Sequence, residues 1–247
     1  MDVWTKRRAS APRGAFVAEA AGLDWIRVPG GPPVPRVHEV TATSLRMDLV
    51  PVSEPSEFVA EDFGRRLAVL HGTPAAMYGA SWTGFIGPVG DLLPMDNAPD
   101  DTWAAHFRTR RVLPALELAE SRGAVTAGDA TDVRQVLDRL EELVPEEGPV
   151  RLHGDLWTGN VLWAADAAWL IDPAAHGGHP ETDLAMLALF GLPFLDVVLA
   201  AYADTRPLAD GWRERVAVHQ LWPLLVHAAL NGASYGHQAG QAARTYL

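Results

Sequence analysis

Three side chains suited to phosphoryl transfer lie close together in the sequence, in the run from His153 to Asp172. Asn160 follows Asp155 by five residues, and Asp172 follows Asn160 by twelve. This order matches the His-x-Asp-x-x-x-x-Asn and downstream Asp of kinase-type enzymes. Mg²⁺ prefers carboxylate and amide oxygens as ligands, and a second carboxylate can take the proton of an attacking hydroxyl. The pattern predicts an enzyme that uses ATP and Mg²⁺, with Asp155 as the base and Asn160 and Asp172 on the metal.

The flanking residues predict how these groups are held. Val161–Trp163 and Ala168–Ile171 have the apolar character of two short strands joined by a turn near 165–166. Such a hairpin places Asn160 and Asp172 at the same open end. Polar residues in a glycine-containing loop can instead serve only as turn hydrogen-bond partners. The ordered combination of all three, with strand-like flanks, favours the catalytic interpretation.

The composition excludes several functions. The chain has 247 residues, a formal net charge of −11 and few lysines. Because binding to nucleic acid depends on clustered Lys and Arg, nucleic acid is not an expected partner. The sequence contains no Cys, so it has no disulfide, thiolate zinc site or thiol nucleophile, as suits a cytoplasmic enzyme.

The sequence contains neither a recognisable signal peptide nor a recognisable membrane span. Met1–Arg8 contains basic residues without a following apolar run, unlike a signal peptide. Leu184–Ala203 is apolar, but Gly191, Pro193 and Asp196 interrupt it, which favours two buried helical pieces over a membrane span. We therefore expect a soluble protein without a membrane partner.

The first fifty residues predict a small β-rich lobe that contains one helix. Pro35–Val40 and Ser44–Val50 are β-like runs separated by the short connection 41–43, which predicts an antiparallel hairpin. Ala15–Trp25 has apolar residues at helical spacing, and the Gly-Gly-Pro-Pro cluster at 30–33 follows it. We assign residues 1–50 to this lobe.

Residues 51–247 predict a larger, mainly helical lobe. Expected helices cover residues 55–71, 101–121, 130–143, 182–190, 195–202 and 211–235. Residues 72–100 read as a loop of Gly, Pro and Asp that is longer than a simple connection needs, so we expect it to be functional. The fold class is thus α+β with two lobes.

Several segments in order resemble the fructosamine kinase (ketosamine-3-kinase) family, a branch of the aminoglycoside-phosphotransferase and choline-kinase group. The loop His-Gly-Asp-x-x-x-x-Asn is shared by that wider group. Trp157 inside the loop and the His-x-Gly-x-x-Glu-x-Asp-Leu-Ala-Met run at 176–186 are more specific. The matching segments are Trp4–Lys6, Phe16–Leu23, Leu67–His71, His153–Asn160, Ile171–Ala174, Gly177–Met186 and Leu189–Gly191. The resemblance implies a protein-kinase-like fold whose first lobe is shortened at its N-terminus.

The resemblance also implies nucleotide-binding residues in the first lobe. Lys6 corresponds to the strand lysine that contacts the α- and β-phosphates, and Glu19 corresponds to the helix carboxylate that pairs with it. Met47 would lie at the back of the adenine pocket. The Asp48 carbonyl and the Val50 amide would bind the adenine edge. From position alone, Lys6 could equally be a solvated lysine near the terminus.

For the second lobe, the resemblance agrees with Asp155 as the base and with Asn160 and Asp172 on magnesium. It identifies Asp183 as the buried carboxylate that braces the catalytic loop through backbone N–H groups. We expect His153 to hold this loop by hydrogen bonds, as a supporting residue.

Further aromatic residues and histidines are weaker candidates. Trp157 is expected to form an apolar wall for the acceptor, with core packing as the alternative. His176 is a candidate acceptor contact. His71 is expected to be structural, and His176 and His179 lack a nearby third ligand that would suggest zinc. The aromatic and leucine residues of the C-terminal helices are expected to be core.

The sequence departs from the family pattern in two places. Family members have two strands and a glycine loop before the lysine, and no such segment precedes Lys6. We expect this to reflect either a late start of the sequence or a weakened or inactive relative. Pro180 stands where relatives carry Arg, which could have paired with a carboxylate or touched the substrate.

These observations predict an ATP-dependent kinase that phosphorylates a sugar hydroxyl, with O3 expected by resemblance, of a fructosamine or ribulosamine on a free amine or a protein lysine. Acidic charge near the site would favour cationic amines as acceptors. Two alternatives stay open. One is phosphorylation of an aminoglycoside or choline-type amino alcohol, and the other is a non-catalytic pseudokinase that binds a nucleotide or a partner. The oligomeric state is not indicated.

Overall fold

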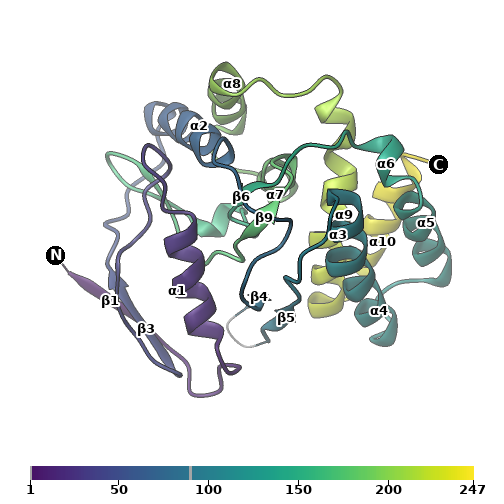
Figure 1. Ribbon diagram of the computed structural model, residues 1–247, viewed down its shortest axis with the longest axis horizontal. Helices are drawn as coiled ribbons and strands as arrows, with labels where there is room; N and C mark the ends of the chain where they lie inside the picture. The colour runs from purple at the N-terminus through teal and green to yellow at the C-terminus, as the bar shows by residue number, and fades with distance from the viewer. Residues whose placement is uncertain (1, 89–90) are drawn as a thin grey trace.

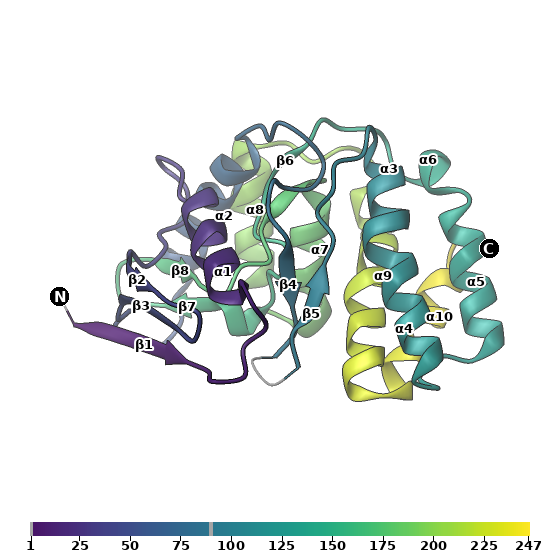
Figure 2. The ribbon, with the colours of Figure 1, turned by 60° about the horizontal axis from the view of Figure 1, so that its bottom comes forward.

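A computed structural model describes residues 2–88 and 91–247. The three-stranded sheet and the helix α1 lie at one end of the molecule, and a group of helices that includes α4, α5, α9 and α10 lies at the other (Figure 1). Helix α7 lies between these two parts (Figure 2), and α2 packs against α8. The α+β class with two lobes, expected from the sequence, is confirmed.

The smaller lobe is an antiparallel sheet of strand order β1-β3-β2 with one helix packed against it. Its elements are β1 (Val3–Arg7), α1 (Ala15–Trp25), β2 (Val37–Val40) and β3 (Ser44–Asp48). Gly14 allows the chain to turn into α1 because its φ of 87° lies in the left-handed region that favours glycine. The predicted hairpin and helix are therefore both present.

The middle of the molecule contains the short strands that carry the chemistry. Its elements are α2 (Glu57–His71), β4 (Gly84–Ile86), β5 (Leu93–Met95), β6 (Val150–Leu152), β7 (Val161–Trp163), β8 (Ala168–Leu170), β9 (His176–Gly178), α7 (Glu181–Phe190) and α8 (Leu195–Thr205). The strands pair as β4-β5, β6-β9 and β7-β8. Ser56 caps α2 by accepting a hydrogen bond from the Val59 N–H.

The remaining elements form the helical end of the larger lobe. They are α3 (Trp103–His106), a π-helical turn (Phe107–Val112), α4 (Leu113–Ser121), α5 (Ala127–Leu137), α6 (Leu140–Leu143), α9 (Trp212–Asn231) and α10 (Ala233–Arg244). Helix α9 packs against α4, α7 and α10, so it forms the centre of this end.

Three sequence-based expectations need correction. The expected loop at 72–100 contains the β4–β5 hairpin. Each of its strands has three residues, which is too short to show an alternating apolar pattern in the sequence. The helix expected over 211–235 ends at Asn231, because Gly232 has a φ of 105° and begins a second helix, α10. The helix expected over 130–143 begins at Ala127 and is interrupted between α5 and α6.

The apolar core does not stop at residue 50. One cluster of buried side chains contains Phe16 and Leu45 of the first lobe together with Phe63, Leu170 and Val198 of the second. We propose that residue 50 separates the two lobes, although both lobes contribute side chains to this one apolar core. Within the described part of the chain, no helix combines the length and apolar character needed to cross a bilayer.

Candidate functional site

The catalytic loop is tied to the start of α7 through Asp183. One carboxylate oxygen accepts a hydrogen bond from the His153 N–H at 2.7 Å, and the other accepts one from the Gly154 N–H at 2.9 Å. Gly154 has a φ of 80°, and a Cβ at this position would lie 2.2 Å from the Ala174 carbonyl oxygen. Glycine is therefore required where the loop turns beside the strand β9.

Asp155, Asn160 and Asp172 meet at one point, as their spacing predicts. The Asn160 Nδ2 donates to the Asp155 carbonyl at 2.8 Å and to the Asp155 carboxylate at 3.0 Å. It also donates to the Asp172 carbonyl at 3.5 Å. With its nitrogen turned toward these acceptors, the Asn160 side chain has its Oδ1 left for another ligand.

The backbone at Asp172 is strained. Its φ of 53° places a non-glycine residue in the left-handed region, which aspartate tolerates better than most residues. Pro173 follows, and a Cβ on Gly22 of α1 would lie 3.0 Å from the Pro173 Cγ. Helix α1 thus packs directly against the segment that orients the Asp172 carboxylate.

Lys6 joins two carboxylates at the junction of the lobes. Its Nζ lies 3.0 Å from both carboxylate oxygens of Glu19 and 2.9 Å from the Asp172 Oδ1. Burial alone would lower the pKa of Lys6, but the two carboxylates outweigh it and raise the pKa, so Lys6 stays protonated. Burial and the negative charge of Asp172 raise the pKa of Glu19 to about 7. Lys6 thus pairs with Glu19 and is not a solvated lysine, and its contact with the nucleotide phosphates stays a prediction.

Asp155 has the electrostatic character of a proton acceptor near neutral pH. Burial raises its pKa to about 7, although the hydrogen bond from Asn160 acts in the opposite direction. The negative charges of Asp172 and Asp183 add to the rise. A carboxylate with this pKa is basic enough to take a proton from a hydroxyl group and is still substantially ionised at pH 7.

Two buried histidines support the loop. The His153 Nε2 donates to the Ile171 carbonyl at 2.9 Å, which leaves its Nδ1 to accept from the Asp155 N–H at 3.2 Å. His71 lies between Asp183 at 3.2 Å and the Tyr202 hydroxyl at 3.0 Å. Burial lowers the pKa of His153, so it stays neutral. Both residues have the structural environment that the sequence indicated.

A cavity of about 370 Å³ opens beside the catalytic groups. Lys6, Glu19, Asp155, Asn160 and Asp172 line one side of it. The lining also includes the aromatic residues Phe16, Trp82, Phe85, Trp157 and Trp222. An acceptor bound here would rest against apolar walls with its hydroxyl near Asp155.

Much of this wall could not be identified from the sequence. Trp222, Val226 and Leu230 come from α9, and Phe85 comes from the β4–β5 hairpin. We expected the residues of α9 to be core, and Trp222 is indeed only 5 % exposed, but it also borders the cavity. The unusual length of the 72–100 segment was the one available signal for the hairpin.

The two acceptor candidates have different outcomes. Trp157 is 38 % exposed and borders the cavity, so it is not a core residue. The expectation for His176 is wrong, because the residue is only 3 % exposed, its Nδ1 donates to the Ala174 carbonyl at 2.9 Å, and it does not border the cavity. Its position in β9, opposite Leu152, turns the ring into the protein toward His106 and Trp222.

His179 does have potential ligands nearby, contrary to the expectation. Ligand atoms of His179, Glu181 and His219 lie within 4.8 Å of one another, and all three residues are buried. Arg215 donates to both carboxylate oxygens of Glu181, at 2.9 and 2.5 Å. This guanidinium supplies the positive charge that a metal would bring. Pro180 cannot pair with a carboxylate as an Arg at that position could. The neighbouring Glu181 is paired with Arg215 instead.

The expected adenine-binding residues lie along the end of β3. Met47 is 2 % exposed within the core, and the Asp48 side chain accepts hydrogen bonds from the Arg36 N–H and pairs with His38 at 2.7 Å. The backbone roles expected for Asp48 and Val50 stay predictions.

The fold and the converging Asp, Asn and Asp groups define a phosphotransferase of protein-kinase-like fold with an alcohol group as acceptor. The fructosamine kinase family model matches residues 2–247. The chain belongs to the fructosamine kinase family.

Individual relatives agree. A probable ketoamine kinase of Thermus thermophilus is 34 % identical over 230 residues, which cover 93 % of this chain and 82 % of the relative. The crystal structure of a candidate fructosamine-3-kinase from Thermobifida fusca superposes with a TM-score of 0.93 at 50 % identity, covering 98 % of this chain and 84 % of that one. A complex of the aminoglycoside phosphotransferase APH(4)-Ia with ADP and hygromycin B shares the fold, with a TM-score of 0.59 at 15 % identity over 99 % of this chain and 94 % of that one.

Proposed function

We propose that this protein transfers the γ-phosphate of ATP to a sugar hydroxyl of a ketosamine, such as a fructosamine or ribulosamine, with O3 as the position. One observation carries the proposal: Asp155, Asn160 and Asp172 converge beside a cavity with aromatic walls in a member of the fructosamine kinase family. Aromatic faces suit the apolar face of a sugar ring, and carboxylates beside them suit an amine.

We assign the base to Asp155. Its carboxylate is oriented by the Asn160 Nδ2 and borders the cavity, so an acceptor hydroxyl can reach it. In the reaction, the hydroxyl oxygen forms a bond to the γ-phosphorus, the bond from that phosphorus to the β-phosphate oxygen breaks, and the hydroxyl proton passes to Asp155. The geometry of Asp155 thus sets which hydroxyl reacts.

We assign magnesium to Asn160 and Asp172, and the side chains fit it. The Asn160 Oδ1 is left available because the Nδ2 donates elsewhere, and the Asp172 carboxylate borders the same cavity with its Oδ1 2.9 Å from the Lys6 Nζ. An amide oxygen and a carboxylate are suitable ligands for this hard cation. Bound magnesium would neutralise charge on the phosphates.

We assign phosphate binding to Lys6, held by Glu19, and adenine binding to Met47 and the backbone of Asp48 and Val50. Lys6 lies on the strand next to the one that ends in these residues. Asp183 and His153 act through the catalytic loop, which they hold in place by the hydrogen bonds described above.

The test is a comparison of acceptors with the purified protein, ATP and Mg²⁺. Fructosyl-lysine and ribulosyl-lysine are compared with an aminoglycoside and with choline, and ADP release and the phosphorylated product are measured. We expect turnover on the ketosamines and, by NMR of the product, phosphate at O3.

Each other result has a definite meaning. Strong turnover on the aminoglycoside and none on either ketosamine would replace the proposal with the amino-alcohol alternative. Nucleotide binding without turnover on any acceptor would indicate a pseudokinase. Phosphate at another hydroxyl would overturn only the O3 assignment.

A further inference from the structure

Arg8 directly follows strand β1, whose first residue, Val3, lies opposite Asp48 of the proposed adenine site. In the antiparallel pair of β1 and β3, Lys6 lies opposite Leu45. The Arg8 N–H continues the ladder by donating to the Thr43 carbonyl at 2.8 Å. Side chains two residues apart on a strand share a face, so Lys6 and Arg8 point the same way, about 7 Å apart along the strand. Arg8 is therefore beyond the phosphate-binding lysine, on the side away from the adenine.

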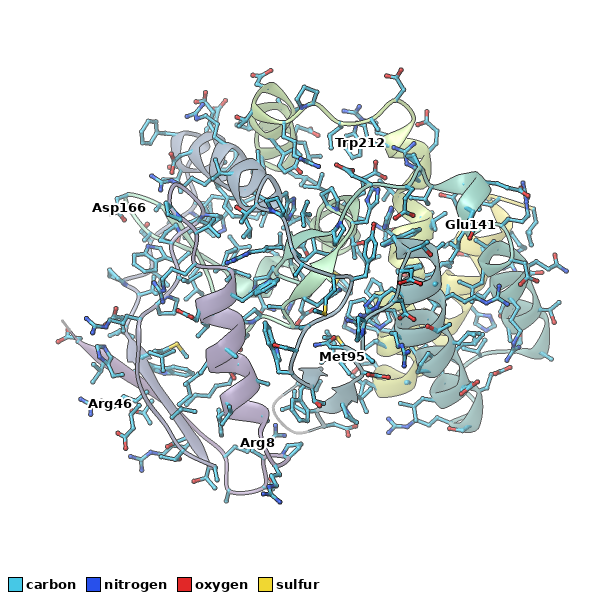
Figure 3. The ribbon with its side chains drawn as sticks, in the orientation of Figure 1. Arg8, Arg46, Met95, Glu141, Asp166 and Trp212 are labelled. Atoms are coloured by element: carbon cyan, nitrogen blue, oxygen red, sulfur yellow. The ribbon has the colours of Figure 1, made fainter. Side chains whose placement is uncertain are left out.

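Both cations border the cavity that contains Asp155. Arg8 contributes to its lining together with Phe16 of α1 and Phe85 of the β4–β5 hairpin. Figure 3 shows Arg8 at the lower end of α1, near where that helix begins. Arg8 thus borders the cavity near the N-terminal end of α1.

The Arg8 guanidinium has no partner among the described residues. It makes no hydrogen bond or ion pair with them, and its Nη1 is buried from solvent. The three carboxylates that border the cavity are engaged elsewhere: Glu19 and Asp172 contact Lys6, and Asp155 accepts from Asn160. A buried N–H group of a charged side chain without a partner is costly, so a ligand that fills this position gains binding energy.

The neighbouring backbone favours the same charge. Helix α1 begins at Ala15, which also borders the cavity, and its first turn contains no acidic residue and no side-chain cap. The N-terminal end of a helix carries partial positive charge. Although the whole chain is acidic, with a net charge of −11, Arg8 and the start of α1 both favour an anion at this part of the cavity.

We propose that Arg8 binds a carboxylate of the acceptor, so that the preferred acceptors are ketosamines of free amino acids. This inference rests on the proposed function and narrows its substrate class. A ketosamine formed on the α-amine of an amino acid has a cationic secondary amine, which suits the acidic and aromatic side of the cavity, and a carboxylate a few bonds away. The acceptor that we propose is therefore a zwitterion, with an amine and a carboxylate, rather than the cationic amine expected from the sequence.

The test compares two acceptors that differ only in that charge: the ketosamine of glycine and the ketosamine of glycinamide. Arg8→Met is compared with wild type, and Arg7→Met, which alters an exposed neighbour on the opposite face of β1, is the matched control. For Arg8→Met we expect KM for the glycine ketosamine to rise about tenfold. We expect kcat, KM for ATP and KM for the glycinamide ketosamine to stay within about twofold of wild type.

A charge reversal provides an independent measurement. Arg8→Glu should weaken the glycine ketosamine further and improve KM for the ketosamine of ethylenediamine, whose free amine takes the place of the carboxylate. The melting temperature of Arg8→Met should be no lower than that of wild type, because the substitution removes an unpaired buried N–H group and breaks no contact with the described residues.

The outcomes separate the two claims. An equal rise in KM for both glycine-derived acceptors, or no rise, would overturn the role of Arg8 and leave the ketosamine kinase intact. A rise confined to KM for ATP would assign Arg8 to the nucleotide phosphates and overturn the inference as well. If wild-type protein phosphorylates no ketosamine, the proposed function fails, and the inference fails with it.

Discussion

The ammonium group of Lys6 lies 2.9 Å from the carboxylate of Asp172. These residues come from different lobes, one from the three-stranded sheet and one from the end of the β7–β8 hairpin. Glu19 completes the arrangement at 3.0 Å from the same nitrogen. One cation shared by two carboxylates thus links the sheet to the catalytic groups.

Replacing Lys6 with Met should therefore impair nucleotide use most. The variant loses the cation proposed for the phosphates and leaves Glu19 and Asp172 without their common partner. We expect KM for ATP to rise by at least about tenfold and kcat to fall. Steady-state kinetics with varied ATP check this, and an unchanged KM for ATP would remove Lys6 from the nucleotide site.

Replacing Asp155 with Asn should abolish most turnover without unfolding the protein. The amide cannot accept the hydroxyl proton, and we expect kcat to fall by roughly 10² to 10⁴. Asp166→Asn is a matched control, because Asp166 lies in the exposed turn between β7 and β8, at the outer edge of the molecule in Figure 3. Similar kcat values for the Asp155 variant and wild type would refute the assignment of the base.

Replacing Asp183 with Asn should reduce both stability and turnover. The side chain is 1 % exposed and accepts from two backbone N–H groups, and an amide can accept from only one of them. We expect the free energy of unfolding to fall by about 2 to 3 kcal/mol. Urea unfolding measures this change. Asp204→Asn, on the exposed surface of α8, should change it little.

Acid should destabilise the protein from near pH 6.5 downward. Burial lowers the pKa of His179 to about 3, with the charge of His219 adding to the effect. Between about pH 6.5 and 3 the unfolded chain binds a proton at this histidine that the folded protein does not, so stability falls as pH falls. Each such histidine contributes up to about 1.4 kcal/mol per pH unit.

The measurement is the free energy of unfolding between pH 7 and 5 for wild type and His179→Asn. The asparagine keeps an acceptor for the Glu181 N–H but does not titrate, so the slope with pH should become shallower. His38, which is on the surface of β2, provides the control substitution. Parallel slopes for wild type and His179→Asn would contradict the prediction.

The parts of the site that come from one stretch of chain could be predicted from the sequence. Asp155, Asn160 and Asp172 are joined by a hairpin of few residues, so local geometry alone brings them together. Helix α1 and the β2–β3 hairpin were likewise visible, because apolar spacing and turn residues mark them directly.

The acceptor wall could not be predicted, because it is assembled from segments far apart in the sequence. Trp222 and Phe85 have apolar side chains that fit a core equally well, and only the packing of α9 beside the β4–β5 hairpin exposes them to the cavity. The direction of the His176 ring cannot be read from the sequence either, because the pairing of β9 with β6 decides which way it points. The sequence shows that Arg8 is charged, but only the structure shows that its guanidinium has no partner among the described residues.

Lys6 is the only lysine in the chain. Reducing sugars condense with neutral ε-amines, and this one has a side chain 11 % exposed, contacts two carboxylates and has a raised pKa that keeps it protonated. This chain, which we propose phosphorylates sugar–amine adducts, therefore offers glucose and ribose no free lysine side chain, and Lys6 in its proposed catalytic site is protected from glycation.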